Sequence, residues 1–463
     1  MRTATKRVAA TAISAVMVAL PLTAQQPQRL SLADAVRYAL DHHPALTAAQ
    51  ANVLSARSDV EQVRASRLPA LDAQVQLNRA TGNAVAGAFF PMSSLPAVGG
   101  PPGNRSPEGG SWGATTALVT VLPITALLRT NHLIDAQTAQ LHAAEARRDQ
   151  NRLQVATNAA NAFLEVRAGQ EQRRIAIAAR QRALTIDSLT RVLAAQGLRP
   201  GADSMRTAAE VAGADIDVAR AERRIAVGNA RLAEAVGSPD AVVADTTDLA
   251  ANVTPRRSAM SAPPSMREAD AAVSAAVATR AAASTAWYPR VDLLGAAFLR
   301  GSGEPVPSNS TITPMRGFAP NVGNWALGIV ASWPLLGAPG IHATQRRAAA
   351  EVAAAQARAA ATGNQVAAAR REAESALTGA LAVASRSQAL IDAATAALIQ
   401  MTARYRAGLT SLADVADAQR QLARAQGEEA TARIELTAAR LLVASADGDL
   451  DAFLALLAAG TVR

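Results

Sequence analysis

The sequence predicts a mainly α protein with a small β part, built from two copies of one unit that joins strands to a long helix. From Leu335 to Ala407 the chain is rich in Ala, Arg, Gln, Glu and Leu. At about 1.5 Å per residue this stretch would form a helix about 110 Å long. The same pattern recurs 211 residues earlier, where Pro123 matches Pro334 and Gly237 matches Gly448. An internal duplication of this size predicts two structurally similar halves.

The duplication sets the predicted domain organisation. A first repeat at 25–237 and a second at 265–448 are joined by a linker at 238–264 that lacks periodicity, and a C-terminal tail follows at 449–463. Residues 1–24 begin with Arg2, Lys6 and Arg7 and continue with a short apolar run, which is typical of a signal peptide. We therefore expect an exported protein.

The helices and strands follow the same plan in both halves. The predicted helices cover 31–43, 45–68, 124–196, 204–236, a segment ending at 286, and 335–407, after which helical sequence resumes. The predicted strands cover 71–79, 112–122, 291–300 and 325–333, and the first of them alternates apolar and polar residues. Four strands of about ten residues match the outer-membrane thickness but cannot close a barrel alone. Because an open edge in lipid leaves backbone groups unsatisfied, we expect oligomers, with eight strands from two chains or twelve from three.

Composition excludes several functions. Only 3% of the 463 residues are aromatic and cysteine is absent, which argues against a large globular core and rules out disulfides and thiolate sites. The formal charge is +9, but basic and acidic residues alternate along the helices, as in EARRDQNR. That pattern indicates solvated helix faces and no nucleic-acid partner.

Three aromatic residues stand where predicted strands meet predicted helices: Trp287, Tyr288 and Trp333. Such residues form girdles at the lipid–water boundary of membrane barrels, and equally they pack at strand ends in other proteins. Both readings stay open at this point.

The stretch SLADAVRYALDHHPALTAAQ, its second-half counterpart PSMREADAAVSAAVATRAAASTAWYPRVDL and two GLxxxxD turns resemble the TolC family of outer-membrane efflux proteins. The resemblance covers nearly the whole chain after the signal peptide. It implies a homotrimer with a twelve-stranded β-barrel in the outer membrane, continued by an α-helical barrel across the periplasm. The implied function is the exit duct of a tripartite efflux or type I secretion system, working with a periplasmic adaptor and an inner-membrane pump.

The resemblance also assigns roles to residues of the two turns. The helix tips that would meet the adaptor carry Gly197, Leu198, Gly408 and Leu409. Tyr405, Asp414 and Asp417 fall on positions of the periplasmic gate. Studied gates have an arginine where this chain has Thr410, so the resemblance does not carry an arginine-locked gate over to this chain.

Asp414 and Asp417 have a physical rationale of their own. Ser411 to Asp414 fits a capping box, which gives Asp414 a purely structural alternative role. Asp417 lies three residues further, on the same helix face, so threefold assembly would stack two carboxylate rings along a pore. Such rings should attract cations and raise at least one carboxyl pKa, and Asp203 of the other half could add charge.

The sequence offers no defensible enzyme site. His42 and His43 are adjacent on a helix, so their side chains diverge, and no third ligand follows. Gly99, Gly100 and Gly103 lie among prolines without a following helix, which is unlike a phosphate-binding loop. We expect no catalysis, cofactor or metal. The alternative function is an exported alanine-rich coiled-coil scaffold or adaptor without a pore.

Overall fold

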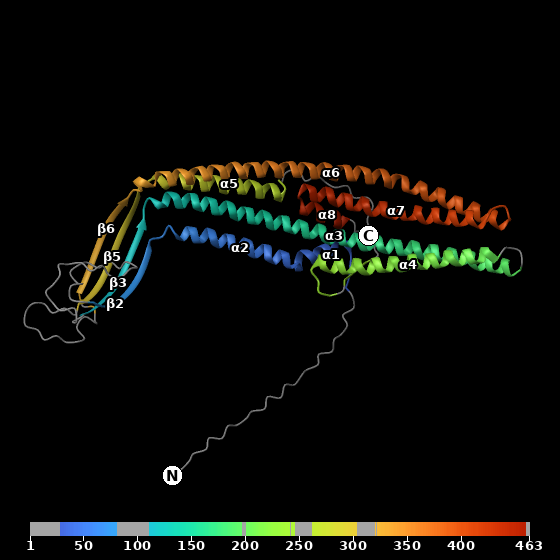
Figure 1. The fold of residues 1–463 in the computed structure, drawn as a ribbon, viewed down its shortest axis with the longest axis horizontal. Coiled ribbons are helices and arrows are strands. Elements are labelled where there is room, and N and C mark those ends of the chain that lie inside the picture. Colours follow the sequence, from blue (N-terminus) through green and yellow to red (C-terminus); the bar gives the residue numbers. More distant parts are fainter. Residues whose placement is uncertain are drawn as a thin grey trace, which may run out of the picture.

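The computed structural model describes residues 28–80, 111–196, 201–240, 242–245, 262–302, 320 and 322–459. The described chain is a long rod, with a curved sheet at one end and helices along the rest (Figure 1). The predicted signal peptide and most of the predicted linker lie outside the described residues.

Two helical sets form the rod, one from each half of the chain. Their bounds are α2 Pro44–Ala65, α3 Ala126–Ala195 and α4 Gly201–Val236 in the first half, and α5 Pro264–Ser284, α6 Ala338–Arg406 and α7 Leu412–Asp447 in the second. α2 and α4 lie end to end beside α3, as α5 and α7 do beside α6 (Figure 1). The short 3-10 helices η2 Thr285–Trp287 and η3 Leu335–Gly337 join helices to strands. The predicted duplication of long and return helices is confirmed.

Two matching glycines hold the end-to-end arrangement. Gly237 and Gly448 follow α4 and α7 with φ of 72° and 75°. A Cβ at Gly237 would lie 3.0 Å from His43 and Pro44, and one at Gly448 would lie 2.7 Å from Pro264. Each return helix therefore ends directly against the start of a short helix, at a left-handed position that favours glycine.

The sheet contains one antiparallel pair of strands from each half. The order is β2 Ala70–Ala80, β3 Ser111–Pro123, β5 Arg290–Ser302 and β6 Val322–Ser332. Register places Leu118 opposite Ala297 and Ala297 opposite Trp325. Within the described residues, β2 and β6 each pair on one side only, so the single-chain sheet is open.

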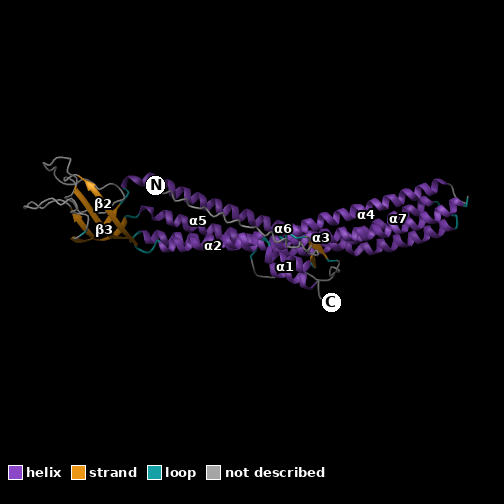
Figure 2. Cartoon of the chain, turned by 90° about the horizontal axis from the view of Figure 1, so that it is seen from below, coloured by secondary structure: helices purple, strands orange, loops and turns teal. Residues whose placement is uncertain are grey.

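The main core lies at the middle of the rod, where sequence analysis expected a linker and a tail. There β1 Gln28–Leu30 pairs in parallel with β4 Val242–Ala244, beside α1 Leu32–His42 and α8 Leu450–Ala459 (Figure 2). The fully buried side chains of Phe163 and Phe453 belong to this cluster. The linker and tail therefore contribute part of the core.

Candidate functional site: the helix tips and the membrane face

The turn between α6 and α7 is fixed by its backbone. Gly408 has φ 76°, its N–H donates to the carbonyl of Tyr405 at 3.0 Å, and the N–H of Leu409 donates to that of Arg404 at 2.9 Å. This pair of bonds is a Schellman motif, which ends a helix through a left-handed residue. Nothing lies within 4 Å of a Cβ at Gly408, so backbone conformation alone favours glycine. Leu409 is 69% exposed at the tip.

Asp414 forms the predicted capping box at the start of α7. Its backbone N–H donates to the Ser411 hydroxyl at 3.3 Å, and its Oδ2 accepts from the backbone N–H of Ser411 at 3.0 Å. The hydroxyls of Thr410 and Ser411 donate to the same oxygen at 2.6 and 2.7 Å. The Thr410 hydroxyl, followed by the Ser411 donors, lowers the pKa of Asp414. These bonds oppose the rise in pKa that a carboxylate ring would cause.

Asp417 lies one turn further along α7 and belongs to an ion-pair network. The guanidinium of Arg420 pairs with the Asp417 carboxylate and, at 2.7 Å, with Glu210 of α4. Arg420 thus joins α7 to the return helix of the other hairpin. Asp414 and Asp417 are both exposed, whereas Val415 and Ala418, which lie beside them on the same turns of the helix, are buried.

Tyr405 is a core residue of the tip. It is 3% exposed and packs with Leu412 and Val415 of α7 and with Ile186 of α3. The side chain at the expected gate position therefore holds the two hairpins together at this point.

A buried carboxylate joins α3 to α4 near the same level. Asp187 is 5% exposed, accepts from the Thr207 hydroxyl of α4 at 2.7 Å and pairs with Arg191 at 2.7 Å. The Thr207 hydrogen bond lowers the pKa of Asp187, as does Arg191, while burial opposes them. The carboxylate is therefore held ionised inside the hairpin.

The remaining tip residues are placed only in part. Asp203 lies half-buried in the first turn of α4, where an acid favours the helix dipole. Gly197 and Leu198 lie outside the described residues. Arg420, Glu210, Asp187 and Thr207 were not among the residues predicted from the sequence. The spacing of Asp417 and Arg420 was a usable local signal, but Glu210 and Thr207 meet their partners only through packing between helices.

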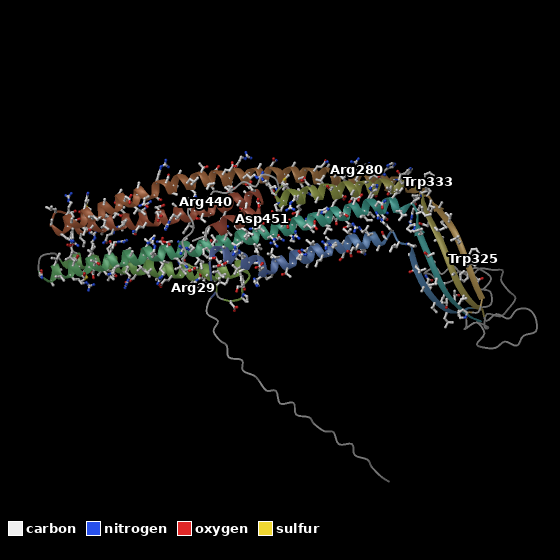
Figure 3. All side chains as sticks on the ribbon, turned by 180° about the vertical axis from the view of Figure 1, so that it is seen from behind. Arg29, Arg280, Trp325, Trp333, Arg440 and Asp451 are labelled. Carbon is white, nitrogen blue, oxygen red and sulfur yellow. The ribbon has the colours of Figure 1, made fainter. Side chains whose placement is uncertain are left out.

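The three junction aromatics are exposed at the helix end of the sheet. Trp287, Tyr288 and Trp333 are 40, 55 and 56% exposed, and the Trp287 ring lies 6.0 Å from that of His342. Trp325 is 80% exposed, eight residues before Trp333 and well along β6 (Figure 3). At about 3.3 Å per residue the two indoles are separated by about 26 Å along the strand, which matches the apolar band of a membrane barrel.

One face of the sheet is apolar and exposed across all four strands. Its most exposed large side chains are Leu71 and Val75 of β2, Leu118 of β3, Leu299 of β5, and Trp325, Leu327 and Ile329 of β6, with exposed fractions from 50 to 83%. We call this surface the outer face. A contiguous exposed apolar surface of this kind marks an interaction site, and its place on a sheet suits contact with lipid.

No described helix is long and apolar enough to cross a membrane. No group of three or more His, Cys, Asp or Glu side chains in the described ranges could hold a metal ion.

The sequence profile of the outer membrane efflux protein family matches residues 35–238 and 256–449. The chain belongs to this family. This confirms the resemblance inferred from the two GLxxxxD turns and the duplicated helix starts. The protein is an efflux duct of the outer membrane that extends into the periplasm, and the alternative of a scaffold without a pore is not supported. The family is one of ducts and not of enzymes.

Solved structures with the same fold include three bacterial membrane proteins. A membrane protein from Pseudomonas aeruginosa matches with a TM-score of 0.77 at 20% identity, covering 90% of both chains. The CmeC outer membrane channel of Campylobacter jejuni gives 0.75 at 17% identity, over 90% of this chain and 85% of that one. VceC of Vibrio cholerae gives 0.73 at 20% identity, over 90% and 96%. No curated protein matches the sequence.

Proposed function

We propose that three copies of this efflux duct close a twelve-stranded barrel in the outer membrane and a helical barrel below it. The duct is passive, and an inner-membrane pump and a periplasmic adaptor supply cargo and energy. The main support for a trimer is the open sheet. Its edge strands β2 and β6 each pair on one side only, and both contribute exposed residues to the apolar outer face.

The size of the pore favours three chains over two. Two chains would give eight strands, and an eight-stranded barrel is just wide enough for side chains to fill its interior. Twelve strands leave an open lumen, as a duct requires. Backbone groups at the edges of β2 and β6 would be satisfied by the neighbouring chain, since lipid offers no hydrogen bonds.

Cross-linking tests the closure, because the chain contains no cysteine. Val75→Cys on β2 combined with Leu327→Cys on β6 should give a ladder ending at three chains after treatment with a flexible bismaleimide. Val75→Cys alone is the matched control and should not extend the ladder beyond two chains. Native mass spectrometry of the detergent-extracted protein should show three chains, and a monomer or dimer would contradict the trimer.

We further propose that the tips dock the adaptor and that Asp414 and Asp417 form an ion-selective constriction there. Leu409 is exposed at the tip, and Gly408 fixes the turn that presents it. Gly197 and Leu198 would act likewise on the other hairpin. Asp203 is the weaker candidate for added charge.

Single-channel recording in planar bilayers tests the constriction. Asp414→Ala combined with Asp417→Ala should weaken cation preference and block by divalent cations. Asp215→Ala, which removes an exposed acid paired with Arg180 on the other hairpin, is the matched control. Unchanged selectivity in the double variant would leave Asp414 with its capping role only.

A further inference from the structure

A groove lies on α3 near the middle of the rod, next to the main core. α3 packs against both α4 and α7, and side chains from all three helices line the groove. One end reaches β4, because the side-chain amide of Gln170 lines the groove and donates to the carbonyl of Ala244 at 2.9 Å. The groove is open to solvent and has a volume of about 820 Å³, which is enough for a small ligand.

The charged side chains of this groove are mostly basic. Its lining contains the arginines Arg167, Arg173, Arg174 and Arg433 and the acids Glu171 and Glu222. Next to the lining, Glu429 pairs with Arg433 at 2.8 Å, Asp245 follows Ala244, and the Arg224 side chain packs against Gly169 of α3. With these neighbours included, five arginines face four carboxylates, so the groove carries a net charge of +1.

The unbalanced positive charge lies where one carboxylate is shared between two guanidinium groups. Glu171 accepts from Nε of Arg174 at 2.9 Å and pairs with Nη2 of Arg167 at 3.5 Å. Glu222, by contrast, pairs with a single arginine, Arg173, at 3.1 Å. A second carboxylate or similar anion beside Glu171 would complete the charge balance of Arg167 and Arg174.

Arg167 also has an unused hydrogen-bond donor. Its side chain is 5% exposed, and Nη1 donates to Gln170 at 2.8 Å, but no described residue accepts from its buried Nε. A buried guanidinium group that is incompletely paired lowers the stability of the fold. Because Arg167 lines the groove, a ligand bound there can supply the missing acceptor.

We propose that this groove binds a small oxyanion, a phosphate or a carboxylate, held by Arg167, Arg174 and Arg433. Arginine suits such a ligand because its planar set of N–H donors matches two oxygen atoms at once. The first two arginines belong to α3 and the third to α7, so the bound anion links the second hairpin to the first at the middle of the rod. The site is remote from the tips and requires neither the trimer nor the constriction proposed above.

Thermal unfolding of the full-length, detergent-extracted protein tests the site. Inorganic phosphate, acetate and chloride are compared at equal ionic strength. Phosphate or acetate should raise the melting temperature above its value in chloride, by an amount that grows with concentration as the binding equation requires. Titration calorimetry with the same two anions then gives their affinities, and the tighter of the two identifies the class of oxyanion.

Arg174→Gln combined with Arg433→Gln should weaken anion binding at least about tenfold, because each change removes a charge-assisted hydrogen bond. The matched control, Arg180→Gln with Arg424→Gln, takes one exposed arginine outside the groove from each of the same helices and should keep the affinity. Arg433→Gln alone serves if the double variant does not fold, and should weaken binding less. Glu171→Gln should have the opposite effect and tighten binding about threefold, because it removes a negative charge about 6 Å from the anion.

Equal anion affinity in the wild type and in the Arg174/Arg433 variant would overturn the site. A rise in melting temperature would then reflect only the exclusion of phosphate from protein surfaces, which stabilises many folded proteins. Hydrogen exchange tests the link between the hairpins. Phosphate should slow exchange in both 167–178 of α3 and 427–437 of α7, and slower exchange in α3 alone would contradict the link.

Discussion

The two periplasmic hairpins, α3–α4 and α6–α7, are copies in sequence but are fastened differently. In its tip half α3–α4 is joined by polar contacts: Arg173 with Glu222, Arg180 with Asp215, and the buried bond from Thr207 to Asp187. The tip half of α6–α7 is joined by apolar clusters around Leu422 and around Tyr405. The paired helices of the two hairpins are alike in length, 70 and 36 residues against 69 and 36, but the contacts between them differ.

This difference in contacts indicates that the two hairpins differ in how freely their helices can move. Ion pairs and a buried carboxylate require specific geometry, so they favour one fixed arrangement of α3 against α4. Apolar contacts are not directional, so they restrain the sliding of one helix along another less. Contacts that tie α7 to the first hairpin include Ile186 with the Tyr405 cluster, Glu210 with Arg420, and a hydrogen bond from Arg182 to Gln426. We therefore expect α3–α4 to act as the frame and α6–α7 as the movable part.

The largest effect is expected from Tyr405→Ala. Truncating a buried aromatic side chain costs about 3–5 kcal/mol. Amide hydrogens of 412–425 should then exchange at least about 100-fold faster, while those of 201–222 keep most of their protection. Tyr405→Phe retains the ring and is the control, with a much smaller change. Equally faster exchange in both hairpins would contradict the assignment of α3–α4 as the frame.

Features set by local sequence were predictable, and those set by packing between distant segments were not. Proline positions and residue patterns located the four strands and helices α1 to α4 and α6 to within a few residues. For α5 only the end was predicted, and for α7 only its presence. Ser411 to Asp414 gave the capping box. β1 and β4 are three residues each, too short to show periodicity. Arg420 meets Glu210 only because α4 and α7 adopt one relative rotation, which no local pattern encodes.

The next largest effect is expected from Thr207→Val, which tests whether α3–α4 depends on its buried polar contact. The variant keeps the shape of the side chain but leaves the buried Asp187 with one donor fewer, at a cost of about 1–3 kcal/mol. Exchange in 201–215 should accelerate. Thr185→Val is the control, because the Thr185 hydroxyl bonds only to its own helix and is exposed.

The same pair has a pH signature. Thr207 lowers the folded pKa of Asp187, so its stabilisation is present above the unfolded carboxyl value of about 3.9 and is lost as pH falls through the folded value. The wild-type α3–α4 hairpin should therefore hold above about pH 4 and loosen below it. Thr207→Val raises the folded pKa, so loosening should begin at a higher pH, and an unchanged profile would contradict the role of Thr207.

Gly408→Ala should have an intermediate effect on the movable hairpin. A Cβ at φ 76° costs about 1 kcal/mol or slightly more, although no neighbour obstructs it. Gly427→Ala, inside α7 with nothing within 4 Å, should instead stabilise by up to about 1 kcal/mol. Bulkier residues at Gly408 should abolish transport while the trimer remains. Loss of the trimer would make this glycine a requirement for folding.

The smallest energetic effect is expected from breaking the ion pair between Arg420 of α7 and Glu210 of α4, which joins the movable hairpin to the frame. Channel conductance reports on this pair directly. Arg420 is 53% exposed, so its pair with Glu210 contributes about 0.2–1 kcal/mol per chain. Arg420→Ala should shift the tips toward the open state and raise single-channel conductance, more at low salt, where screening leaves the pair strongest. Arg424→Ala is the matched control one turn away, since Arg424 reaches only Glu428 of its own helix at 4.0 Å.

Glu210→Gln should reproduce the Arg420→Ala conductance, because either change breaks the same link. If Glu210→Gln leaves conductance unchanged, the effect of Arg420 operates through Asp417 within α7, and the first hairpin does not restrain the second at this position.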